Sequence, residues 1–316
     1  MSRLQPGDQA FDYDSLYGTE NEMPYSGSRS FMRRRLTRDL NGVDYAVMGV
    51  PYDLSTSGRP GTRFGPEALR RATAQLSWGE VWPWGFDPFD RLAVVDYGDV
   101  HFKRGQPERM LQNTIDQALT VLRSGTRLIG LGGDHLSTYP LLKAHAEIHG
   151  PLALIQFDAH RDTADSEDLD HGSFVHHAMK EGLIDPKRSI QIGIRTFYDH
   201  FDDMTVLYRP WVRENGVPAL IEKIKSVVGD GPAYLTFDID SIDPAFAPGT
   251  GTPVVDGLQP FEAIDTIRAL GDLNIVGMDV VEVSPPYDHA ETTALLGASV
   301  ILEHLCAVAD KRGERY

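Results

Sequence analysis

The feature that most constrains the fold of this chain is a repeated alternation between short apolar runs and longer amphipathic segments. Runs rich in Val, Ile and Leu predict eight strands, at residues 44–50, 92–98, 127–133, 151–157, 189–195, 205–208, 233–239 and 275–283. Segments with helical spacing of apolar residues lie between most of them, at 65–77, 107–125, 137–149, 172–183, 217–229, 261–270 and 293–312. Near-continuous apolar strands that alternate with helices are typical of an α/β fold whose parallel sheet is covered on both faces. Periodicity alone leaves open whether the sheet is open or closed into a barrel.

The charge of the chain excludes several classes of partner. The 316 residues include 30 basic and 46 acidic side chains, which give a formal net charge of −16. Nucleic acid and anionic membranes both require a cationic face, so neither is an expected partner, whereas a small cationic substrate suits an acidic chain. The basic run at 31–38 is expected to be solvated or to face an interface rather than to bind nucleic acid.

The sequence also bears on the cellular compartment. The first residues contain no apolar segment of the kind found in signal peptides, and no run reaches the ~18 apolar residues of a membrane-spanning helix. Cys306 is the single cysteine, and its helical surroundings predict a core residue rather than a nucleophile. We therefore expect a cytoplasmic protein.

Polar side chains follow four of the predicted strands. These candidates are His135 after the third strand, Asp158, His160 and Asp162 after the fourth, Asp238 and Asp240 after the seventh, and Glu282 at the end of the eighth. A single Asp at a strand end is usually a turn former or a helix cap. Several carboxylates buried at one sheet edge require a cation, because like charges repel and desolvation is costly.

The candidate ligands favour a pair of metal ions. Imidazoles and carboxylates without a thiolate suit a hard to borderline cation such as Mn²⁺ better than a structural zinc. Asp158, Asp162, Asp238 and Asp240 carry four negative charges, which two divalent ions balance. Two metals about 3.5–4 Å apart can lower the pKa of a shared water towards neutrality, so the pattern points to a hydroxide nucleophile.

The motifs around these residues resemble those of the ureohydrolase family of arginases and agmatinases. The resemblance is carried by GGDH at 132–135, DAHRD at 158–162 and FDIDSIDPAFAPGTGTP at 237–253. It extends to the segments at 56–70, 170–174, 182–196 and 274–288, and spans about residues 40 to 310. The chain is most similar to bacterial agmatinases.

The resemblance implies a fold, a reaction and an assembly. It implies a single α/β domain at 41–316, with an eight-stranded, mostly parallel sheet and helices on both faces, preceded by an N-terminal arm at 1–40. It implies two Mn²⁺ per chain, whose bridging hydroxide hydrolyses a guanidino compound to an amine and urea. The favoured reaction is conversion of agmatine to putrescine and urea, a step in polyamine biosynthesis. It also implies a homo-oligomer, a trimer or a hexamer.

Carried over residue by residue, the resemblance assigns the site. One manganese is expected at His135, Asp158, Asp162 and Asp238, and the other at Asp158, His160, Asp238 and Asp240. Asp162 is also expected to orient the hydroxide, Glu282 to pair with the guanidinium, and His171 to pass a proton to the leaving amine. A buried carboxylate opposite a planar guanidinium can make two parallel charge-assisted hydrogen bonds, which fixes its orientation.

Two further features bear on the substrate and point in opposite directions. Asp168 and Asp170 belong to an acidic loop at 163–170, which favours a distal ammonium, as in agmatine, over a carboxylate. Arg161 departs from the family pattern, which has a small residue between the His and the Asp of this motif. Adjacent side chains of an extended segment face opposite ways, so we expect Arg161 to point away from the metals, towards a carboxylate or a subunit contact. The alternative is that it borders the channel and receives a substrate carboxylate.

Other functions stay open at this point. The same centre could act on 4-guanidinobutyrate, 3-guanidinopropionate or a related guanidine. The chain could also be a metal-binding homologue without turnover. A deacetylase that uses a single zinc on a similar sheet is disfavoured by the presence of six candidate ligands.

Overall fold

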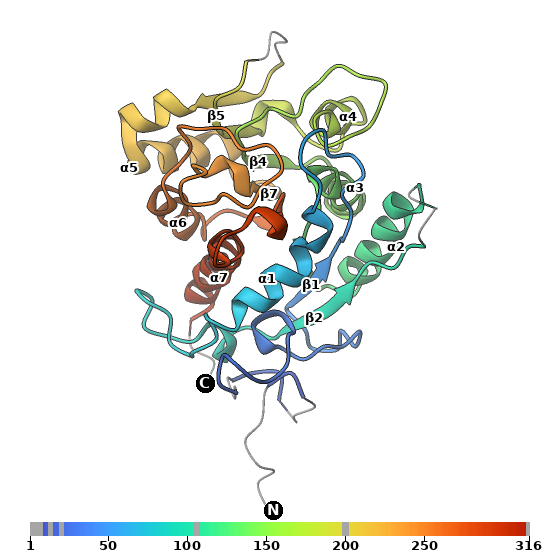
Figure 1. Ribbon diagram of the computed structural model, residues 1–316, viewed down its shortest axis with the longest axis vertical. Helices are drawn as coiled ribbons and strands as arrows, with labels where there is room; N and C mark the ends of the chain where they lie inside the picture. Colours follow the sequence, from blue (N-terminus) through green and yellow to red (C-terminus); the bar gives the residue numbers. More distant parts are fainter. Residues whose placement is uncertain are drawn as a thin grey trace, which may run out of the picture.

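The chain folds around one open parallel sheet. The computed structural model describes residues 9–11, 15–18, 22–103, 106, 108–197 and 202–313. The sheet has eight strands in the order β2-β1-β3-β8-β7-β4-β5-β6, and every neighbouring pair is parallel (Figure 1). Their bounds are β1 Tyr45–Gly49, β2 Val94–Asp99, β3 Arg127–Leu131, β4 Ala153–Phe157, β5 Ile190–Ile194, β6 Thr205–Tyr208, β7 Ala233–Asp238 and β8 Ile275–Val281. All eight predicted strands are therefore confirmed, and the sheet is open rather than a barrel.

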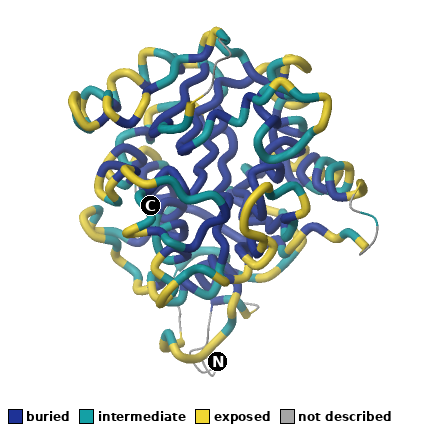
Figure 2. Tube along the Cα trace, turned by 45° about the horizontal axis from the view of Figure 1, so that its top comes forward, coloured by how far each residue is buried: buried dark blue, intermediate teal, exposed yellow. Residues whose placement is uncertain are grey.

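Helices cover both faces of the sheet. On one face α1 (Gly65–Thr73), α5 (Arg209–Val228), α6 (Pro260–Arg268) and α7 (Thr292–Arg312) enclose one apolar core. On the other face α2 (Arg109–Arg123), α3 (Thr138–His149) and α4 (Phe174–Lys180) enclose a second. Figure 2 shows the sheet as a buried centre inside a partly exposed shell. The central strands β4, β7 and β8 are buried along their whole length, which explains why their sequences are apolar without alternation.

Two helices differ from the sequence expectation. α5 begins at Arg209, eight residues before the predicted start at 217, and a kink at Gly216, with φ of 75°, separates its two parts. Pro218 follows that kink and cannot donate a backbone hydrogen bond, so the apolar pattern identified only the second part. α7 is long and apolar enough to cross a membrane by length and composition. Of its most apolar stretch 72% is buried inside the molecule, so α7 packs as a core helix.

Part of the predicted N-terminal arm packs against the domain. The short 3₁₀ helix Phe31–Arg33 is buried, and the Phe31 backbone N–H donates to Asp96 of β2 over 2.7 Å. Arg33 and Arg34 are each only 1% exposed, so the expectation of a solvated basic run is wrong for these two side chains. Their long apolar stems and local backbone acceptors allow burial that a charge pattern does not reveal. The arm residues 1–8, 12–14 and 19–21 lie outside the described part of the chain.

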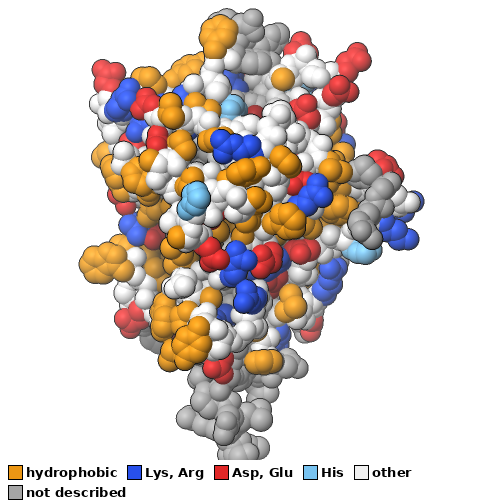
Figure 3. Space-filling model, viewed as in Figure 1, with side chains coloured by type: hydrophobic (Ala, Val, Ile, Leu, Met, Phe, Trp, Pro, Cys, Tyr) orange, Lys and Arg blue, Asp and Glu red, His pale blue; other side chains and the backbone are white. Residues whose placement is uncertain are grey.

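The surface mixes charge types on the face seen in Figure 3. Basic and acidic side chains lie beside one another there, with many hydrophobic side chains between them. This face therefore presents no continuous basic surface.

Candidate metal centre

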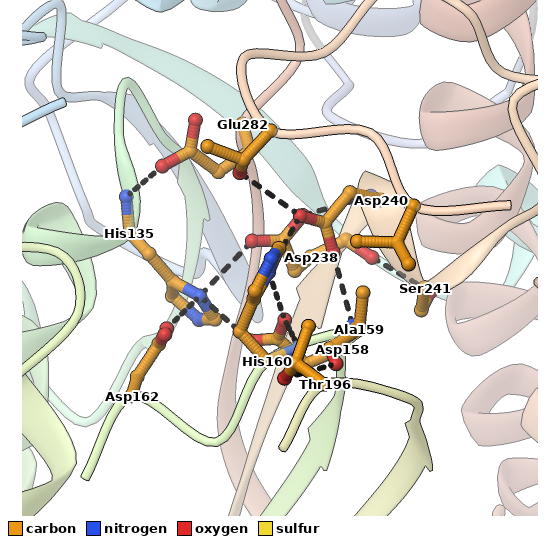
Figure 4. Close-up of polar contacts among 12 residues, drawn as sticks. His135, Asp158, Ala159, His160, Asp162, Thr196, Asp238, Asp240, Ser241 and Glu282 are labelled. Carbon is orange, nitrogen blue, oxygen red and sulfur yellow. Dashed lines mark hydrogen bonds and ion pairs between the residues drawn. The ribbon is translucent and has the colours of Figure 1, made fainter. Parts of the chain in front are cut away.

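The predicted metal ligands come from neighbouring strands. β3, β8, β7 and β4 are consecutive in the sheet and parallel, so their carboxyl ends lie at one edge. His135 lies shortly after β3, Glu282 directly follows β8, Asp238 ends β7, and Asp158 directly follows β4. The side chains converge in space, as Figure 4 shows.

The first group of ligand atoms surrounds His135. Its Nδ1 lies 2.9 Å from Asp162 Oδ2, 3.1 Å from Asp158 Oδ2 and 3.1 Å from Asp238 Oδ2. Despite these short distances, the angles are not those of a hydrogen bond, and this buried nitrogen has no hydrogen-bond partner among the described residues. The other ring nitrogen, Nε2, is occupied by Thr236 Oγ1 at 2.9 Å, which fixes the ring with Nδ1 towards the carboxylates.

The second group shares Asp158 with the first. His160 Nδ1 lies 3.0 Å from Asp240 Oδ2 and 3.5 Å from Asp158 Oδ1. The ligand atoms of His160, Asp158 and Asp240 lie within 4.8 Å of one another, as do those of His135, Asp158 and Asp162. Two adjacent groups that share a carboxylate are the arrangement expected for a pair of metal ions.

Local backbone bonds hold these carboxylates in place. Asp238 Oδ1 accepts from the backbone N–H of Asp240 and so starts a single 3₁₀ turn after β7. Asp240 Oδ1 accepts from Ala159 N–H over 3.0 Å, which ties the β7 turn to the β4 turn. Thr252 Oγ1 donates to Asp240 Oδ2 over 3.2 Å. Asp238 and Asp240 are therefore fixed in orientation, and each keeps an oxygen atom or a lone pair directed towards the other candidate ligands.

The electrostatics of the cluster require cations. Burial and the neighbouring Asp240 and Asp158 carboxylates raise the pKa of Asp238 well above its usual range. Burial and the Asp158 charge raise the pKa of Asp162 to about 7. Burial opposes a charge on His135, but the three carboxylates around it raise its pKa well above its usual value. Without metal, protons neutralise this site, and the converging Nδ1 and oxygen donors fit divalent metal ions in their place.

Beside the metal ligands, His171 and Glu282 form a pair. His171 Nδ1 lies 3.0 Å from Glu282 Oε1, and its Nε2 lies 2.8 Å from Ser57 Oγ and 3.0 Å from the Ser57 backbone nitrogen. Burial lowers the affinity of the imidazole for a proton, but the Glu282 carboxylate outweighs this and raises the pKa of His171 to about 9. Glu282 Oε1 also accepts from His135 N–H, whereas its buried Oε2 has no hydrogen-bond partner among the described residues.

Two site carboxylates occupy left-handed backbone. Asp162 has φ of 53° and Glu282 has φ of 62°, a conformation that costs side chains with a Cβ about 1–2 kcal/mol. Both are fixed by the surrounding contacts of the site. Strain of this kind accumulates at functional sites, where the fold around the residue over-determines its conformation.

A cavity opens onto the candidate ligands. It has a volume of about 260 Å³, and its lining includes His160, Asp162, Asp238 and His171. Glu282 is not among the lining residues, but it contacts His171, which lines the cavity. A larger cavity, of about 460 Å³, is bordered by the first residues of β1, β3 and β8 at the opposite edge of the sheet, far from these side chains. Residue chemistry rather than size therefore identifies the smaller cavity as the candidate active site.

The predicted acidic loop lines the cavity with Thr163 and Ala164, but not with its acidic side chains. Asp168 is exposed, and Asp170 Oδ1 accepts from the backbone N–H of Gly172 over 2.8 Å. Neither side chain lines the cavity. Arg161 borders it, yet its guanidinium is only 5% exposed and pairs with Asp202 over 2.6 Å. This carboxylate contact agrees with the expectation that Arg161 points to a neighbouring acid.

The sequence did not identify the residues that support the site through contacts between segments far apart in the chain. Ser57 contacts His171, and Asp134 accepts from both the N–H and the Oγ of Ser55, which anchors the segment that carries Ser57. The segment 56–70 was recognisable as a motif, but no spacing rule connects it with a histidine more than a hundred residues later.

Comparisons with known proteins decide the family. The sequence model of the Arginase family matches residues 43–307. The chain belongs to the arginase family. It is 54% identical over 310 residues to the agmatinase of Chromobacterium violaceum, which covers 97% of this chain and 96% of that protein. As an arginase-family member with relatives at this level of identity, the chain is an enzyme of the ureohydrolase type.

Solved structures of the arginase family share the fold. The X-ray structure of a hypothetical agmatinase from Burkholderia thailandensis matches with a TM-score of 0.94 and 51% identity, over 97% of this chain and 98% of that one. Proclavaminate amidino hydrolase from Streptomyces clavuligerus matches with a TM-score of 0.84 and 38% identity, over 90% of this chain and 98% of that one. These neighbours agree with the single α/β domain and its parallel sheet.

Proposed function

We propose that this enzyme hydrolyses agmatine to putrescine and urea at a centre of two Mn²⁺ ions. The observation that carries the proposal is the convergence of three carboxylate oxygens on Nδ1 of His135, a buried atom that makes no hydrogen bond within the described part of the chain. Relatives named agmatinase, at about half identity over nearly the whole chain, support the choice of substrate.

Six side chains would hold the metals. His135, Asp158, Asp162 and Asp238 would bind one ion, and Asp158, His160, Asp238 and Asp240 the other. When bound, a pair of divalent ions supplies Lewis acidity and lowers the pKa of water at the site. The nitrogen and oxygen donors, with no thiolate among them, suit Mn²⁺.

Glu282 is proposed to bind the guanidinium. Its Oε1 is held by His171 and His135, but its buried Oε2 lacks a hydrogen-bond partner among the described residues, and a buried polar atom without a partner is costly. A guanidinium supplies both the opposite charge and planar N–H donors. Because His171 lines the cavity and contacts Glu282, a substrate bound to this carboxylate is expected to lie close to the imidazole as well.

His171 is proposed to donate the proton that the leaving amine requires. Glu282 Oε1 holds the proton on Nδ1, so the mobile proton is the one on Nε2. When Nε2 is protonated it can donate to Ser57 Oγ, and when it is neutral it can accept from Ser57 N–H. Ser57 therefore accommodates both protonation states, as a proton-transfer residue requires.

The lining of the cavity supports a substrate without a carboxylate. Among the described lining residues the cationic candidates are His160, His171 and Arg161. The first two are engaged with site carboxylates, and the Arg161 guanidinium is paired with Asp202. The described lining therefore offers a substrate carboxylate only cationic side chains that already pair with acidic residues, which favours agmatine over 4-guanidinobutyrate. A trimer or hexamer stays a prediction of the family resemblance, and a cytoplasmic location stays a prediction from the sequence.

Urea release tests the proposal directly. The purified chain, loaded with Mn²⁺, is given agmatine, arginine, 4-guanidinobutyrate, 3-guanidinopropionate and guanidine in parallel, with Asp162→Asn as the inactive control. Dominant turnover of agmatine is expected. Preference for a carboxylate-tailed compound would overturn the substrate assignment and retain the chemistry. Two bound metals with no urea from any compound would indicate a homologue without turnover.

A further inference from the structure

Two glutamines interrupt otherwise apolar strands next to the metal centre. Gln156 lies in β4 and Gln191 in β5, where they are direct partners in the strand register, and both are fully buried. A buried amide is costly unless its hydrogen bonds are made. Strand pairing does not require glutamine at either position, so the side chains themselves need an explanation.

The two amides form a continuous hydrogen-bonded chain. Arg161 Nε donates to Gln191 Oε1 over 2.8 Å, and Gln191 Nε2 donates to Gln156 Oε1 over 2.8 Å. Gln156 Nε2 then donates to Asp158 Oδ2 over 2.7 Å. Gln191 Nε2 also donates to the Arg161 carbonyl oxygen over 2.6 Å, which fixes the first link from a second side.

The hydrogen bonds between these side chains all have a fixed donor-to-acceptor direction. A guanidinium can only donate and an ionised carboxylate can only accept, so the two ends determine the orientation of both amides between them. The three side-chain hydrogen bonds that link Arg161, Gln191, Gln156 and Asp158 then all run towards Asp158, and hydrogen bonds aligned in this way polarise one another. Asp202, bonded to Arg161 Nη2, holds the guanidinium at the far end.

We propose that Arg161, Gln191 and Gln156 are positioning residues that orient the Asp158 carboxylate for metal binding. This inference rests on the proposed metal centre. Asp158 is the carboxylate shared by both candidate ligand groups, so its orientation affects both ions. An oxygen has two lone pairs, and Gln156 occupies one lone pair of Oδ2 and leaves the other for a metal. Arg161 thereby acquires a role that requires no contact with substrate.

Mn²⁺ binding to the metal-free protein tests the inference without relying on turnover. Gln156→Met keeps the length of the side chain and removes the last donor. We expect its Mn²⁺ affinity, measured by calorimetry and by the paramagnetic resonance of free Mn²⁺, to fall about 10- to 100-fold, as for other outer partners of metal ligands. Gln191→Met breaks the middle link and is expected to weaken binding in the same direction, which gives a second test should the first variant fold poorly.

A double variant distinguishes an effect of Arg161 that passes through the two glutamines from an independent effect of Arg161 on the metal centre. If Arg161 acts through the amides, Gln156→Met/Arg161→Met binds Mn²⁺ as Gln156→Met does, because the link is already broken. If the two losses multiply, Arg161 acts independently and the inference is overturned. Arg209→Met is the matched control, because Arg209 is 4% exposed and pairs with Glu262 over 2.9 Å at a distance from the centre. It should lower the melting temperature and leave the metal affinity unchanged.

The failure of this inference is distinguishable from that of the proposed function. An unmodified chain that binds no Mn²⁺ overturns both. An unmodified chain that binds two ions, beside a folded Gln156→Met that binds them equally well, overturns the positioning role alone.

Discussion

Among single side chains, Glu282 combines burial, left-handed backbone and an oxygen without a hydrogen-bond partner among the described residues. Glu282→Gln keeps the shape and the acceptor for His135 N–H but removes the charge. Loss of one partner of a buried ion pair costs about 3–5 kcal/mol, so kcat/KM for agmatine should fall by about 100-fold or more. Metal content, measured by atomic absorption, should stay at that of the parent. An unchanged kcat/KM would exclude Glu282 from guanidinium binding.

The protonation of His171 predicts a pH dependence. Its pKa is raised to about 9, so the proton on Nε2 is present below that pH and is lost above it. Bound divalent ions oppose the shift, so we expect kcat to decline on the alkaline side from about pH 9 or somewhat below. His171→Asn should lower kcat about 10²- to 10⁴-fold, as for loss of a general acid, and abolish this alkaline limb. A limb that persists in the variant would assign the titration to another group.

The sequence is most informative about side chains that lie close to their own strand ends. His135, Asp158 and Asp240 could be expected to lie together because parallel strands place their carboxyl ends at one edge. Asp168 and Asp170 could not be placed, because the direction of a loop side chain depends on contacts such as the Gly172 N–H that no pattern encodes.

Among elements, the turn between β3 and α3 is tightly confined. A Cβ on Gly133 would lie 1.7 Å from the backbone oxygen of Tyr52, a contact that no side-chain rearrangement relieves. Gly133→Ala should therefore displace the turn that carries His135 and reduce Mn²⁺ binding severely, as measured by calorimetry.

A remote glycine supplies the control for that substitution. Gly125 has φ of +86°, and a Cβ at this position would meet nothing within 4 Å, so Gly125→Ala introduces only backbone strain of about 1–2 kcal/mol. We expect it to lower the melting temperature slightly and to bind Mn²⁺ normally. Equal metal affinities for the two alanine variants would show that the β3 turn tolerates displacement.

At the scale of helices and strands, apolar patterns are sufficient to predict the positions of most elements but not their order in the sheet. Strand and helix positions follow from the alternation because both faces of the sheet are covered, so the central strands are buried and mostly apolar. Strand order does not follow, since β8 lies between β3 and β7 for reasons of long-range packing. The first part of α5 was missed because Gly216 and Pro218 are ordinarily helix breakers.

For the whole molecule, metal removal should reduce stability. Ions that bind the folded chain and not the unfolded one stabilise it by about 2.7 kcal/mol at a hundredfold excess over Kd. Treatment with a chelator should therefore lower the melting temperature measured by calorimetry, and added Mn²⁺ should restore it. The difference should shrink as pH falls below about 7, because Asp162, with its pKa of about 7, is then protonated and competes with the metal. An identical melting temperature with and without Mn²⁺ would contradict a metal centre in the folded chain.

The strand order also has a consequence for synthesis on the ribosome. β2, β1 and β3 come from residues 45–131, and β7, β4, β5 and β6 from residues 153–238, so each side of the sheet is contiguous in the sequence. β8, at Ile275–Val281, is made last and joins them. A nascent chain that stops before residue 275 thus contains all six proposed metal ligands, but His135 and Asp238 belong to separate half-sheets. Only after β8 has been made can it join the two halves and bring the proposed ligands together.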